Sequence, residues 1–451
     1  MRFLARLTAI LAAFVLAAQP VAAQSILRDA EGEKLLQDMV DPLAVAAGLE
    51  PGAVEVVLIG DPSLNAFVAG GQRIYVHSGL INAAASAEEV QGVLAHELGH
   101  ITGGHIIRQG EGMRAATNIS ILSALLGVAA ALAGAGDAAM GVLMAGQQAA
   151  LGKFLAYSRT EEASADAASV EYLTGAGMSG RGAVTFFKRL QNQEFRYGYR
   201  QDEEAGFFRT HPLTGDRIAR LQAAFQVTPY WEKPADPAIQ KRFERMRAKL
   251  YGYLADPKDT LNTYPLTMQT IPAHYARAYA FHKDAQVERA LYETDALIER
   301  EPDNPYFLEL RGQVLLESGR PDEALAPLRE AVRLSGNQPM IAASLGHALI
   351  ATEDKANFEE AERVLRASVA RDRHNPFAWY QLGVVYAARG DVPRARLASA
   401  EQQVMSGRYA EALQSARAAE RTLPHGSPDW IRAQDVAIEA QDALEQLDKR
   451  R

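Results

Sequence analysis

The C-terminal part of the chain repeats, and this repeat constrains the fold more than any other feature. Gly312 and Gly346 lie 34 residues apart inside helical patterns, and Gly383 has the same place in a third segment. Each glycine is followed 12 to 15 residues later by a second small residue, and these are Ala324, Ala361 and Ala395. Two small residues per unit let two helices approach closely, so the pattern predicts pairs of helices that stack along the chain.

A period of 34 residues with this spacing is typical of the tetratricopeptide repeat. A degenerate unit with Ala278 and Ala290 precedes these three units, and another follows around residues 407–423. The second unit carries three extra residues near "DKA". Because about four units suffice for a stable solenoid, we expect an α-solenoid of tetratricopeptide repeats over residues 261–451. The alternative is an unrelated helical bundle.

The stretch "GVLAHELGHITGGH", residues 92–105, contains three histidines and one carboxylate. His96 and His100 are four residues apart, so on a helix both imidazoles face one side and can share an ion. Glu97 borders that face, where it can take a proton from an attacking water. His105 lies beyond two glycines, and we expect it to have a structural role. Alternatively, the histidines are incidental, but two imidazoles and a carboxylate would then be unsatisfied in an apolar helix.

A catalytic zinc ion needs a third protein ligand and one open position. The segment "YSRTEEASADAAS", residues 157–169, can supply that ligand from a second helix, which we expect to begin at a capping box of Ser158 and Glu161. Glu162 and Asp166 share a face of this helix, so Glu162 can bind zinc while Asp166 accepts a hydrogen bond from a ligand imidazole. Glu161 is the rival ligand. Alternatively, both glutamates bind no metal and only interact favourably with the helix dipole at the start of the helix.

The rest of the N-terminal part indicates helices and a few short strands. Residues 31–50 look helical, residues 54–59 form a β-branched run typical of a buried strand, and residues 65–81 predict two strands around a glycine pair. Ser86 and Glu89 form a capping box that opens the histidine helix. We therefore expect a mostly α chain, in which an α+β domain with a small edge sheet, holding the expected zinc site, spans residues 24–260.

An unusual apolar segment interrupts this domain over residues 115–152. Apart from Asp137, no charged residue occurs between Arg114 and Lys153, and the segment is rich in Ala, Gly and Leu. The pattern predicts a helical hairpin. Three roles remain open for it: packing over the protein or a cleft, contact with a membrane or an apolar client, and crossing a bilayer. The many glycines and the short second arm disfavour the last.

The N-terminus has the pattern of an export signal. Arg2 and Arg6 precede an uncharged apolar run over residues 7–18, and small residues at 21–23 offer a cleavage site. We expect a cleaved signal peptide over residues 1–23, with an uncleaved anchor as the alternative. The chain has no cysteine, and together these features indicate the bacterial periplasm. The net charge of -8 and the lack of a basic tail give no reason to expect nucleic-acid binding.

Three motifs together resemble the gluzincin metallopeptidases that are related to the CAAX prenyl proteases and heat-shock membrane proteases. They are HELGH at residues 96–100, ExxAD at 162–166 and THPxxxxR at 210–217, in the order of that family. With an export signal in front and tetratricopeptide repeats behind, essentially the whole mature chain most resembles the periplasmic beta-barrel assembly-enhancing proteases of Gram-negative bacteria. The segment "NAF" at residues 65–67 resembles the edge-strand region of the same family.

The resemblance implies one zinc ion held by His96, His100 and Glu162, with Glu97 as general base. His211, on a loop fixed by a proline, would either stabilise the oxyanion or close the fourth zinc position and keep the enzyme latent. The alternative for His211 is a capped turn. Arg217 would help to position the substrate or this loop, and Asp166 would support a ligand imidazole, as its spacing also indicates.

The expected function is that of an exported zinc endopeptidase that degrades misfolded or stalled envelope and outer-membrane proteins. An extended peptide substrate would pair with the strand near Ala66 and Phe67. The repeats would recruit unfolded or misassembled envelope proteins, or the outer-membrane β-barrel assembly machinery, and a peripheral membrane contact is left open. The alternative is a chaperone-like repeat scaffold for outer-membrane protein assembly, with latent or secondary protease activity.

Overall fold

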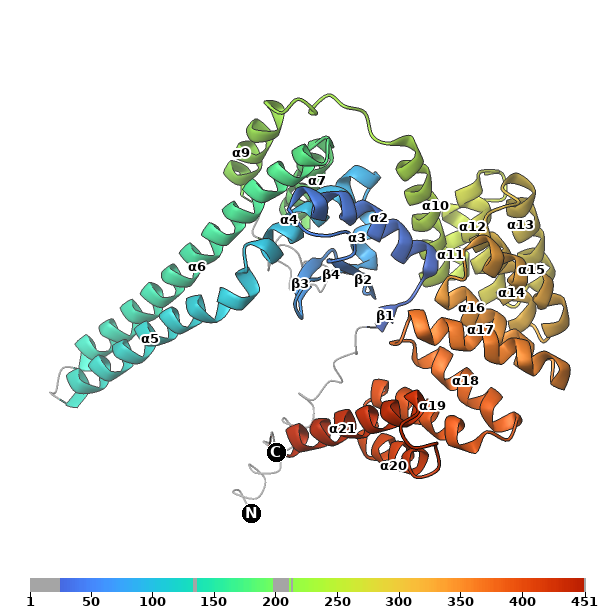
Figure 1. Cartoon of the computed structure of the whole chain (residues 1–451). Coiled ribbons are helices and arrows are strands. Elements are labelled where there is room, and N and C mark those ends of the chain that lie inside the picture. Colours follow the sequence, from blue (N-terminus) through green and yellow to red (C-terminus); the bar gives the residue numbers. More distant parts are fainter. Residues whose placement is uncertain (1–24, 133–135, 198–210, 212–213, 450–451) are drawn as a thin grey trace, which may run out of the picture. The chain divides into compact units, whose positions relative to one another are not determined.

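The computed structural model describes residues 25–132, 136–197, 211 and 214–449 (Figure 1). These residues form two compact units. The first takes the described residues up to Arg28 together with Glu33–Phe243, and the second takes Asp29–Gly32 together with Glu244–Arg451 up to the end of the described part. Helices α2 (Ala30–Ala46) and α10 (Pro237–Leu254) therefore each contribute residues to both units.

A four-stranded sheet lies in the first unit, with the order β1-β2-β4-β3. Its strands are β1 (Ser25–Leu27), β2 (Glu55–Gly60), β3 (Ala66–Ala69) and β4 (Arg73–His77). Strand β4 pairs in parallel with β2 and antiparallel with β3. Gly70 and Gly71 form the β3–β4 turn with positive φ angles of 62° and 98°, which glycine adopts without strain. The strands predicted at 54–59 and within 65–81 are confirmed, and β3 is an edge strand.

Helices make up the rest of the first unit. They are α3 (Ser78–Ala83), α4 (Ala87–Thr102), α5 (His105–Leu132), α6 (Gly136–Gly175), α7 (Arg181–Tyr197) and α9 (Gly215–Gln226), besides most of α2 and the start of α10. Ser86 caps α4 by accepting a hydrogen bond from the amide of Glu89, and Glu89 in turn accepts one from the amide of Ala85. The capping box thus forms where the sequence predicts it, with Ala85 rather than Ser86 as the second donor.

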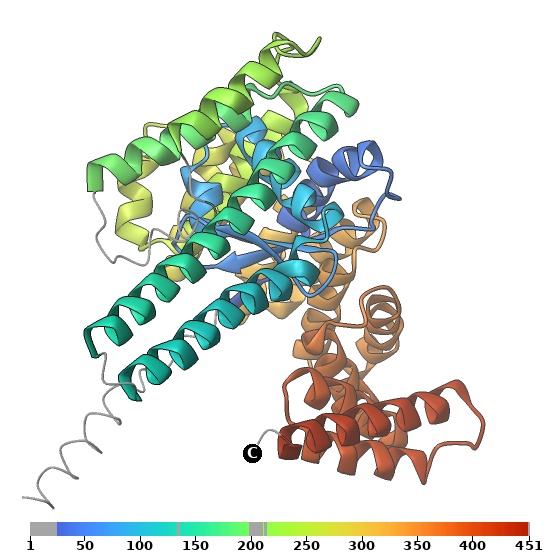
Figure 2. The same cartoon turned by 90° about the vertical axis from the view of Figure 1, so that its left-hand side faces the viewer.

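The apolar segment forms the predicted hairpin, in which α5 and α6 run side by side as an arm that extends from its unit (Figures 1 and 2). The helix start predicted at Ser158 is wrong. Helix α6 runs without a break from Gly136 to Gly175, so Ser158 and Glu161 lie in its interior. A capping box is a local signal, and here the helix-forming residues on both sides, together with packing against α5, continue the helix through it.

The second unit stacks helices in consecutive antiparallel pairs (Figure 1). After the end of α10 they are α11 (Pro257–Thr263), α12 (Ile271–Lys283), α13 (Val287–Arg300), α14 (Pro305–Glu317), α15 (Pro321–Leu334), α16 (Pro339–Ala351), η2 (Lys355–Asn357), α17 (Phe358–Arg371), α18 (Pro376–Ala388), α19 (Val392–Met405), α20 (Tyr409–Glu420) and α21 (Pro428–Lys449). The predicted solenoid is confirmed, and the three extra residues of the second repeat form the short helix η2.

The repeat glycines lie where two helices meet. A Cβ atom on Gly312 would lie 2.4 Å from Cγ of Leu328, and one on Gly346 would lie 2.5 Å from Cγ of Leu365. A continuous core of buried side chains runs through these pairs, from α12 to α19. The small residues thus allow the two helices of each repeat to pack closely, as the repeat pattern predicts.

Two sequence expectations concern membranes and export. The predicted signal peptide, residues 1–23, lies outside the described residues. Within the described part, no helix is both long and apolar enough to cross a bilayer.

Candidate metal centre

Helix α4 carries the HELGH motif through the centre of the first unit. Its side chains are buried on every face, and His96, Glu97 and His100 are 0%, 1% and 9% exposed. Gly99 allows α6 to come close, because a Cβ atom there would lie 2.8 Å from the carbonyl oxygen of Ala165. The glycine of the motif therefore brings the two helices that carry the predicted ligands into contact.

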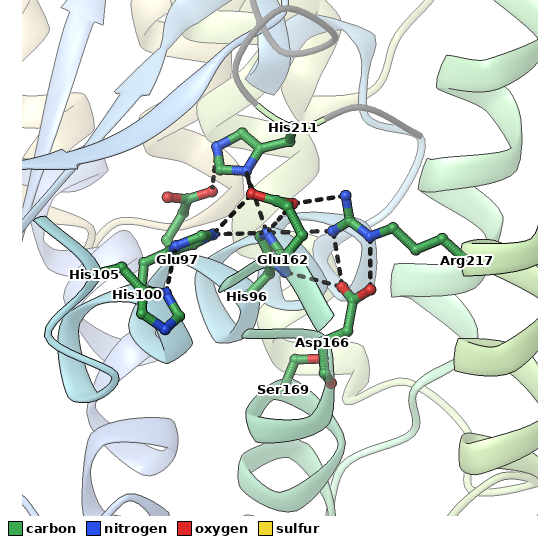
Figure 3. Close-up of polar contacts among 9 residues, drawn as sticks. All are labelled: His96, Glu97, His100, His105, Glu162, Asp166, Ser169, His211 and Arg217. Atoms are coloured by element: carbon green, nitrogen blue, oxygen red, sulfur yellow. Dashed lines mark hydrogen bonds and ion pairs between the residues drawn. The ribbon is translucent and has the colours of Figure 1, made fainter. Parts of the chain in front are cut away.

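Four side chains direct their polar atoms to one point (Figure 3). The Nε2 atoms of His96 and His100 are 3.2 Å apart, and each lies 3.4 Å from an oxygen of Glu162. Nδ1 of His211 lies 3.4 Å from Nε2 of His96 and 2.9 Å from Oε1 of Glu162. These four buried side chains are called the donor group below. Each offers one atom that could bind a metal ion, and these four atoms all lie within 4.8 Å of one another.

The spacing of the donor atoms fits a zinc ion. Zinc bonds of about 2.0–2.1 Å in a tetrahedron place neighbouring ligand atoms about 3.3–3.4 Å apart. The 3.2 Å between the two Nε2 atoms, and the 3.4 Å from His96 to Oε2 and from His100 to Oε1 of Glu162, are close to such edges.

Glu97 lies beside this group. Its Oε1 is 3.5 Å from Nε2 of His211, and no direct hydrogen bond to that oxygen is present among the described residues. Burial raises the pKa of Glu97, although the nearby imidazoles of His211 and His96 act in the opposite direction. A buried carboxylate with a raised pKa, next to the donor group, is suited to accept and return a proton.

Asp166 and Arg217 contact two members of the donor group, His96 and Glu162. One carboxylate oxygen of Asp166 lies 3.1 Å from Nδ1 of His96, and Arg217 donates to both oxygens of Asp166 at 2.6 and 2.8 Å. Arg217 also lies 2.6 Å from Oε2 of Glu162. Thr214 caps α9 by accepting from the amide of Arg217, which fixes this arginine in the first turn of the helix. The arginine thereby links the two carboxylates of α6 to α9.

These contacts change the acidity of the site. Burial alone would raise the pKa of Asp166 and lower that of His96. Hydrogen bonds from Arg217 and His96 outweigh burial at Asp166 and lower its pKa to about 2. The carboxylates of Asp166 and Glu162 likewise raise the pKa of His96 to about 9. Asp166 is therefore a carboxylate at neutral pH, and it can orient the His96 ring through Nδ1.

His105 and Glu161 lie outside the four-residue donor group. Nδ1 of His105 is 2.8 Å from Nδ1 of His100, so it contacts the ring atom opposite the donor Nε2. Such a contact fixes the orientation of the His100 imidazole. The sequence predicts a structural role for His105 but not this partner, because the two glycines between the helices leave the turn of the chain unspecified.

A pocket of about 750 Å³ adjoins the group between α6 and α9. Glu162, Asp166 and Arg217 line one side of it, and Ala163, Ala167 and Val170 of α6 provide an apolar wall. Exposed Arg159 and Arg220 also line it. Sequence reasoning did not find this pocket, since its walls come from two helices about 50 residues apart whose packing no local pattern indicates.

Two protein families have models that match parts of the chain. The family model of peptidase family M48 matches residues 30–224, and a tetratricopeptide repeat model matches residues 275–339 and 351–404. Residues 30–224 are thus similar to peptidase family M48. The chain is thus a metalloendopeptidase of a zinc-dependent family, with tetratricopeptide repeats behind the catalytic domain. The domain boundary predicted at residue 260 lies between the two matched regions and stays a prediction.

Several bacterial proteases are similar to the chain. It is 25% identical to the beta-barrel assembly-enhancing protease of Escherichia coli (strain K12) over 87% of this chain and 79% of that protein. A putative beta-barrel assembly-enhancing protease of Vibrio cholerae is 29% identical over 56% of this chain and 52% of its own length. The metalloprotease LoiP of Escherichia coli is 29% identical over 43% of this chain and 71% of its own length. The first of these similarities extends through both the peptidase domain and the repeats.

Proposed function

We propose that this metallopeptidase is an exported zinc endopeptidase that degrades misfolded or stalled envelope and outer-membrane proteins. The single observation that carries the enzymatic part is the convergence of His96, His100 and Glu162 at separations of 3.2 to 3.4 Å. The names of the relatives, and the export signal expected at residues 1–23, support the envelope as the site of action. The repeats would recruit clients or the β-barrel assembly machinery.

In this proposal His96, His100 and Glu162 hold the zinc ion. When bound, zinc supplies a Lewis acid that polarises the scissile carbonyl. Glu97 accepts the proton of the attacking water and later returns it to the leaving amine, for which its burial and raised pKa suit it. Asp166 and Arg217 act as positioning residues, because they hold the His96 ring and the Glu162 carboxylate rather than the reacting atoms.

His211 would close the fourth position of the site and keep the enzyme latent. Its Nδ1 lies within the donor group, 3.4 Å from His96 and 2.9 Å from Glu162, which is where an attacking water would have to bind. An oxyanion-stabilising role would instead leave this imidazole outside the ligand positions. The geometry therefore favours the latch among the roles that the sequence left open.

An extended substrate would add to the free edge of the sheet at β3. Strand β3 is last in the sheet order, and main-chain pairing with such an edge binds peptides with little regard to sequence. The pocket between α6 and α9 would take one substrate side chain, because Glu162 and Arg217 form part of its wall.

Glu97→Gln tests the enzymatic part. We expect cleavage of casein and of an unfolded outer-membrane protein to fall by about 10²–10⁴-fold, because the general base is lost while the zinc ligands stay. Glu161→Gln is the matched control, since Glu161 lies outside the donor group, and it should retain activity. Full activity of Glu97→Gln, or loss of activity in Glu161→Gln alone, would refute the assignment.

A chaperone-like scaffold is the second candidate. Phe377 and Tyr380 on α18 are 44% and 57% exposed, and the ring of Phe377 packs at 5.5 Å against His347 of the preceding repeat. Exposed aromatic side chains on a repeat surface are suited to capture an unfolded client. If Glu97→Gln binds clients but no longer degrades them, the protease is favoured. If it behaves like the wild-type protein in every assay, the scaffold is favoured.

A further inference from the structure

The arm formed by α5 and α6 exposes large apolar side chains to its surroundings. On α5 these are Ile121, Leu122, Leu125 and Leu126, each more than half exposed, and on α6 they are Met140, Met144, Leu151 and Leu155. Within each helix the spacing places them along one stripe. No charged residue lies between Arg114 and Asp137 or between Asp137 and Lys153, so no charge interrupts the stripe of α5, or that of α6 as far as Leu151.

The two helices of the arm meet through small residues. Ser123 of α5 and Gly146 and Ala150 of α6 are buried in the described part of the arm, and a Cβ atom on Gly146 would lie 2.0 Å from Cβ of Ser123. A helix pair in water buries its large apolar residues and exposes its polar ones. This arm instead exposes large apolar residues and packs its two helices through small ones, as helix pairs in lipid do.

Cationic residues surround the end of the arm that joins the peptidase. Arg108, Arg114, Lys153 and Arg159 lie there with exposed side chains. The sequence places one acidic residue, Glu111, among them. The chain as a whole carries a net charge of -8, so this cluster is a local reversal of sign. Each basic residue near an anionic lipid surface contributes about 1 kcal/mol of binding energy.

We propose that the α5–α6 arm binds an anionic lipid surface and lies in the plane of the membrane interface. The apolar stripe of α5 would enter the boundary between headgroups and acyl chains, and the four basic residues at the base of the arm would contact lipid phosphates. Coverage of the arm by a second copy or by a protein client is a separate outcome, which the experiments below distinguish from lipid binding. The inference does not depend on the proposed protease substrate.

Vesicle binding of the full chain tests the proposal. We expect the wild-type protein to co-sediment with vesicles that contain phosphatidylglycerol and to bind pure phosphatidylcholine vesicles much more weakly. Leu122→Glu with Leu125→Glu should reduce binding to the anionic vesicles at least about tenfold, because two exposed apolar side chains become charged. Val227→Glu is the matched control, because Val227 is 85% exposed in the same unit but lies outside the arm, and it should bind like the wild-type protein.

Two further variants test the geometry. Arg114→Glu with Lys153→Glu should weaken binding to anionic vesicles by about 25-fold or more, at about fivefold per lost cation, and leave binding to neutral vesicles unchanged. The tryptophans of the chain, Trp231, Trp379 and Trp430, all lie outside the arm. In a background with these three replaced by Phe, Leu126→Trp should shift its emission to the blue on binding, with stronger quenching by bromines near the headgroup than by bromines near the bilayer centre.

Three results would overturn the proposal. One is equal vesicle binding by the wild-type protein and the Leu122→Glu with Leu125→Glu variant, or no vesicle binding at all. Another is a change of molar mass by light scattering in that variant, which would assign the arm to a contact between copies. The third is unchanged vesicle binding with weakened capture of an unfolded protein, which would assign it to clients. Circular dichroism and casein cleavage should match the wild-type protein, because these side chains are exposed and remote from the donor group.

Discussion

Each ring nitrogen of the two motif histidines has its own partner. Nε2 of both faces the donor group, while Nδ1 of His96 lies 3.1 Å from Asp166 and Nδ1 of His100 lies 2.8 Å from His105. A partner at Nδ1 selects the tautomer whose Nε2 lone pair is free to bind a metal. The motif therefore depends on two residues beyond HELGH itself.

The sequence predicts this site to the extent that its signals are local. Residues four apart on a helix must share a face, so the sequence alone is enough to pair His96 with His100 and Glu162 with Asp166. The bond from Arg217 to Glu162 could not be predicted in this way. It joins α9 to α6, and only the packing of these helices brings the two charges together. The contact of His105 with His100 could not be predicted either, because it also depends on how two helices pack.

The raised pKa of Glu309, in the second unit, should make the free energy of unfolding depend on pH. Burial raises its pKa to about 7 from an ordinary value of 4.5, although Lys249 nearby acts in the opposite direction. The folded chain thus holds this proton more tightly than the unfolded chain. Its contribution to stability is present below pH 4.5 and is lost as the pH rises towards 7.

Glu309→Gln should therefore stabilise the chain by about 1–3 kcal/mol at pH 8, with a gain that is smaller by about 1–2 kcal/mol at pH 5. Urea unfolding at the two pH values measures both free energies. Glu299→Gln, an exposed glutamate on α13, is the control and should change neither. A gain that is equal at both pH values would contradict the assignment of a half-buried carboxyl group that is protonated in the folded chain.

Among the elements, the repeat helices show how a glycine fixes a helix pair. Gly346 is packed against Leu365, whereas a Cβ atom on Gly383 would find its nearest neighbour, Cβ of Ala398, at 3.4 Å. Gly346→Ala should lower the free energy of unfolding by about 1–3 kcal/mol through overpacking. Gly383→Ala should leave it unchanged or raise it by up to about 1 kcal/mol, because alanine favours the helix. Equal effects of both substitutions in denaturant titrations would refute this interpretation.

The edge strand β3 allows a substitution that separates substrate pairing from sheet stability. The amide of His77 donates to the carbonyl of Asn65 at 3.0 Å, and Ala66 lies opposite Val76. Because antiparallel pairs alternate, the backbone groups of Ala66 and Val68 point away from β4, towards the free edge. Proline at position 68 would remove an outward N–H group and no ladder bond.

Val68→Pro should therefore raise the KM for a long unfolded substrate by about fivefold or more, because one hydrogen bond is worth about 1 kcal/mol, and it should leave the melting temperature nearly unchanged. Val68→Ala keeps the N–H group and serves as the control. Phe67→Pro, which removes a bond to β4, should instead destabilise the sheet. Unchanged cleavage kinetics in Val68→Pro with an intact fold would argue against substrate pairing at β3.

The elements also show where sequence patterns fail. The glycine pair between β3 and β4 and the cap at Ser86 are confirmed, because each fixes a turn by its own local chemistry. The capping box at Ser158 has the same residue types, yet it lies inside the 40-residue helix α6. Whether such a box starts a helix depends on the residues before it, and there α6 packs along α5.

At the scale of the whole molecule, the repeats are the part that the sequence predicts best. Each unit contacts mainly its neighbours, so a local pattern repeated along the chain is enough to specify a solenoid. The division of the chain into two compact units is harder to predict from the sequence. Asp29–Gly32 fall in the second unit, where Glu31 pairs with Arg245 at 2.5 Å and accepts a hydrogen bond from Tyr275 at 2.8 Å. These partners are more than 200 residues away in sequence.

The central claim is that two imidazoles of α4 and one carboxylate of α6 bind a single zinc ion. Anomalous diffraction from crystals of the full chain, recorded on both sides of the zinc absorption edge, tests it most directly. We predict one strong peak per chain, bonded to His96, His100 and Glu162 and lost in Glu162→Ala. A peak bonded to other residues, or no peak from protein purified with zinc present, would contradict the account.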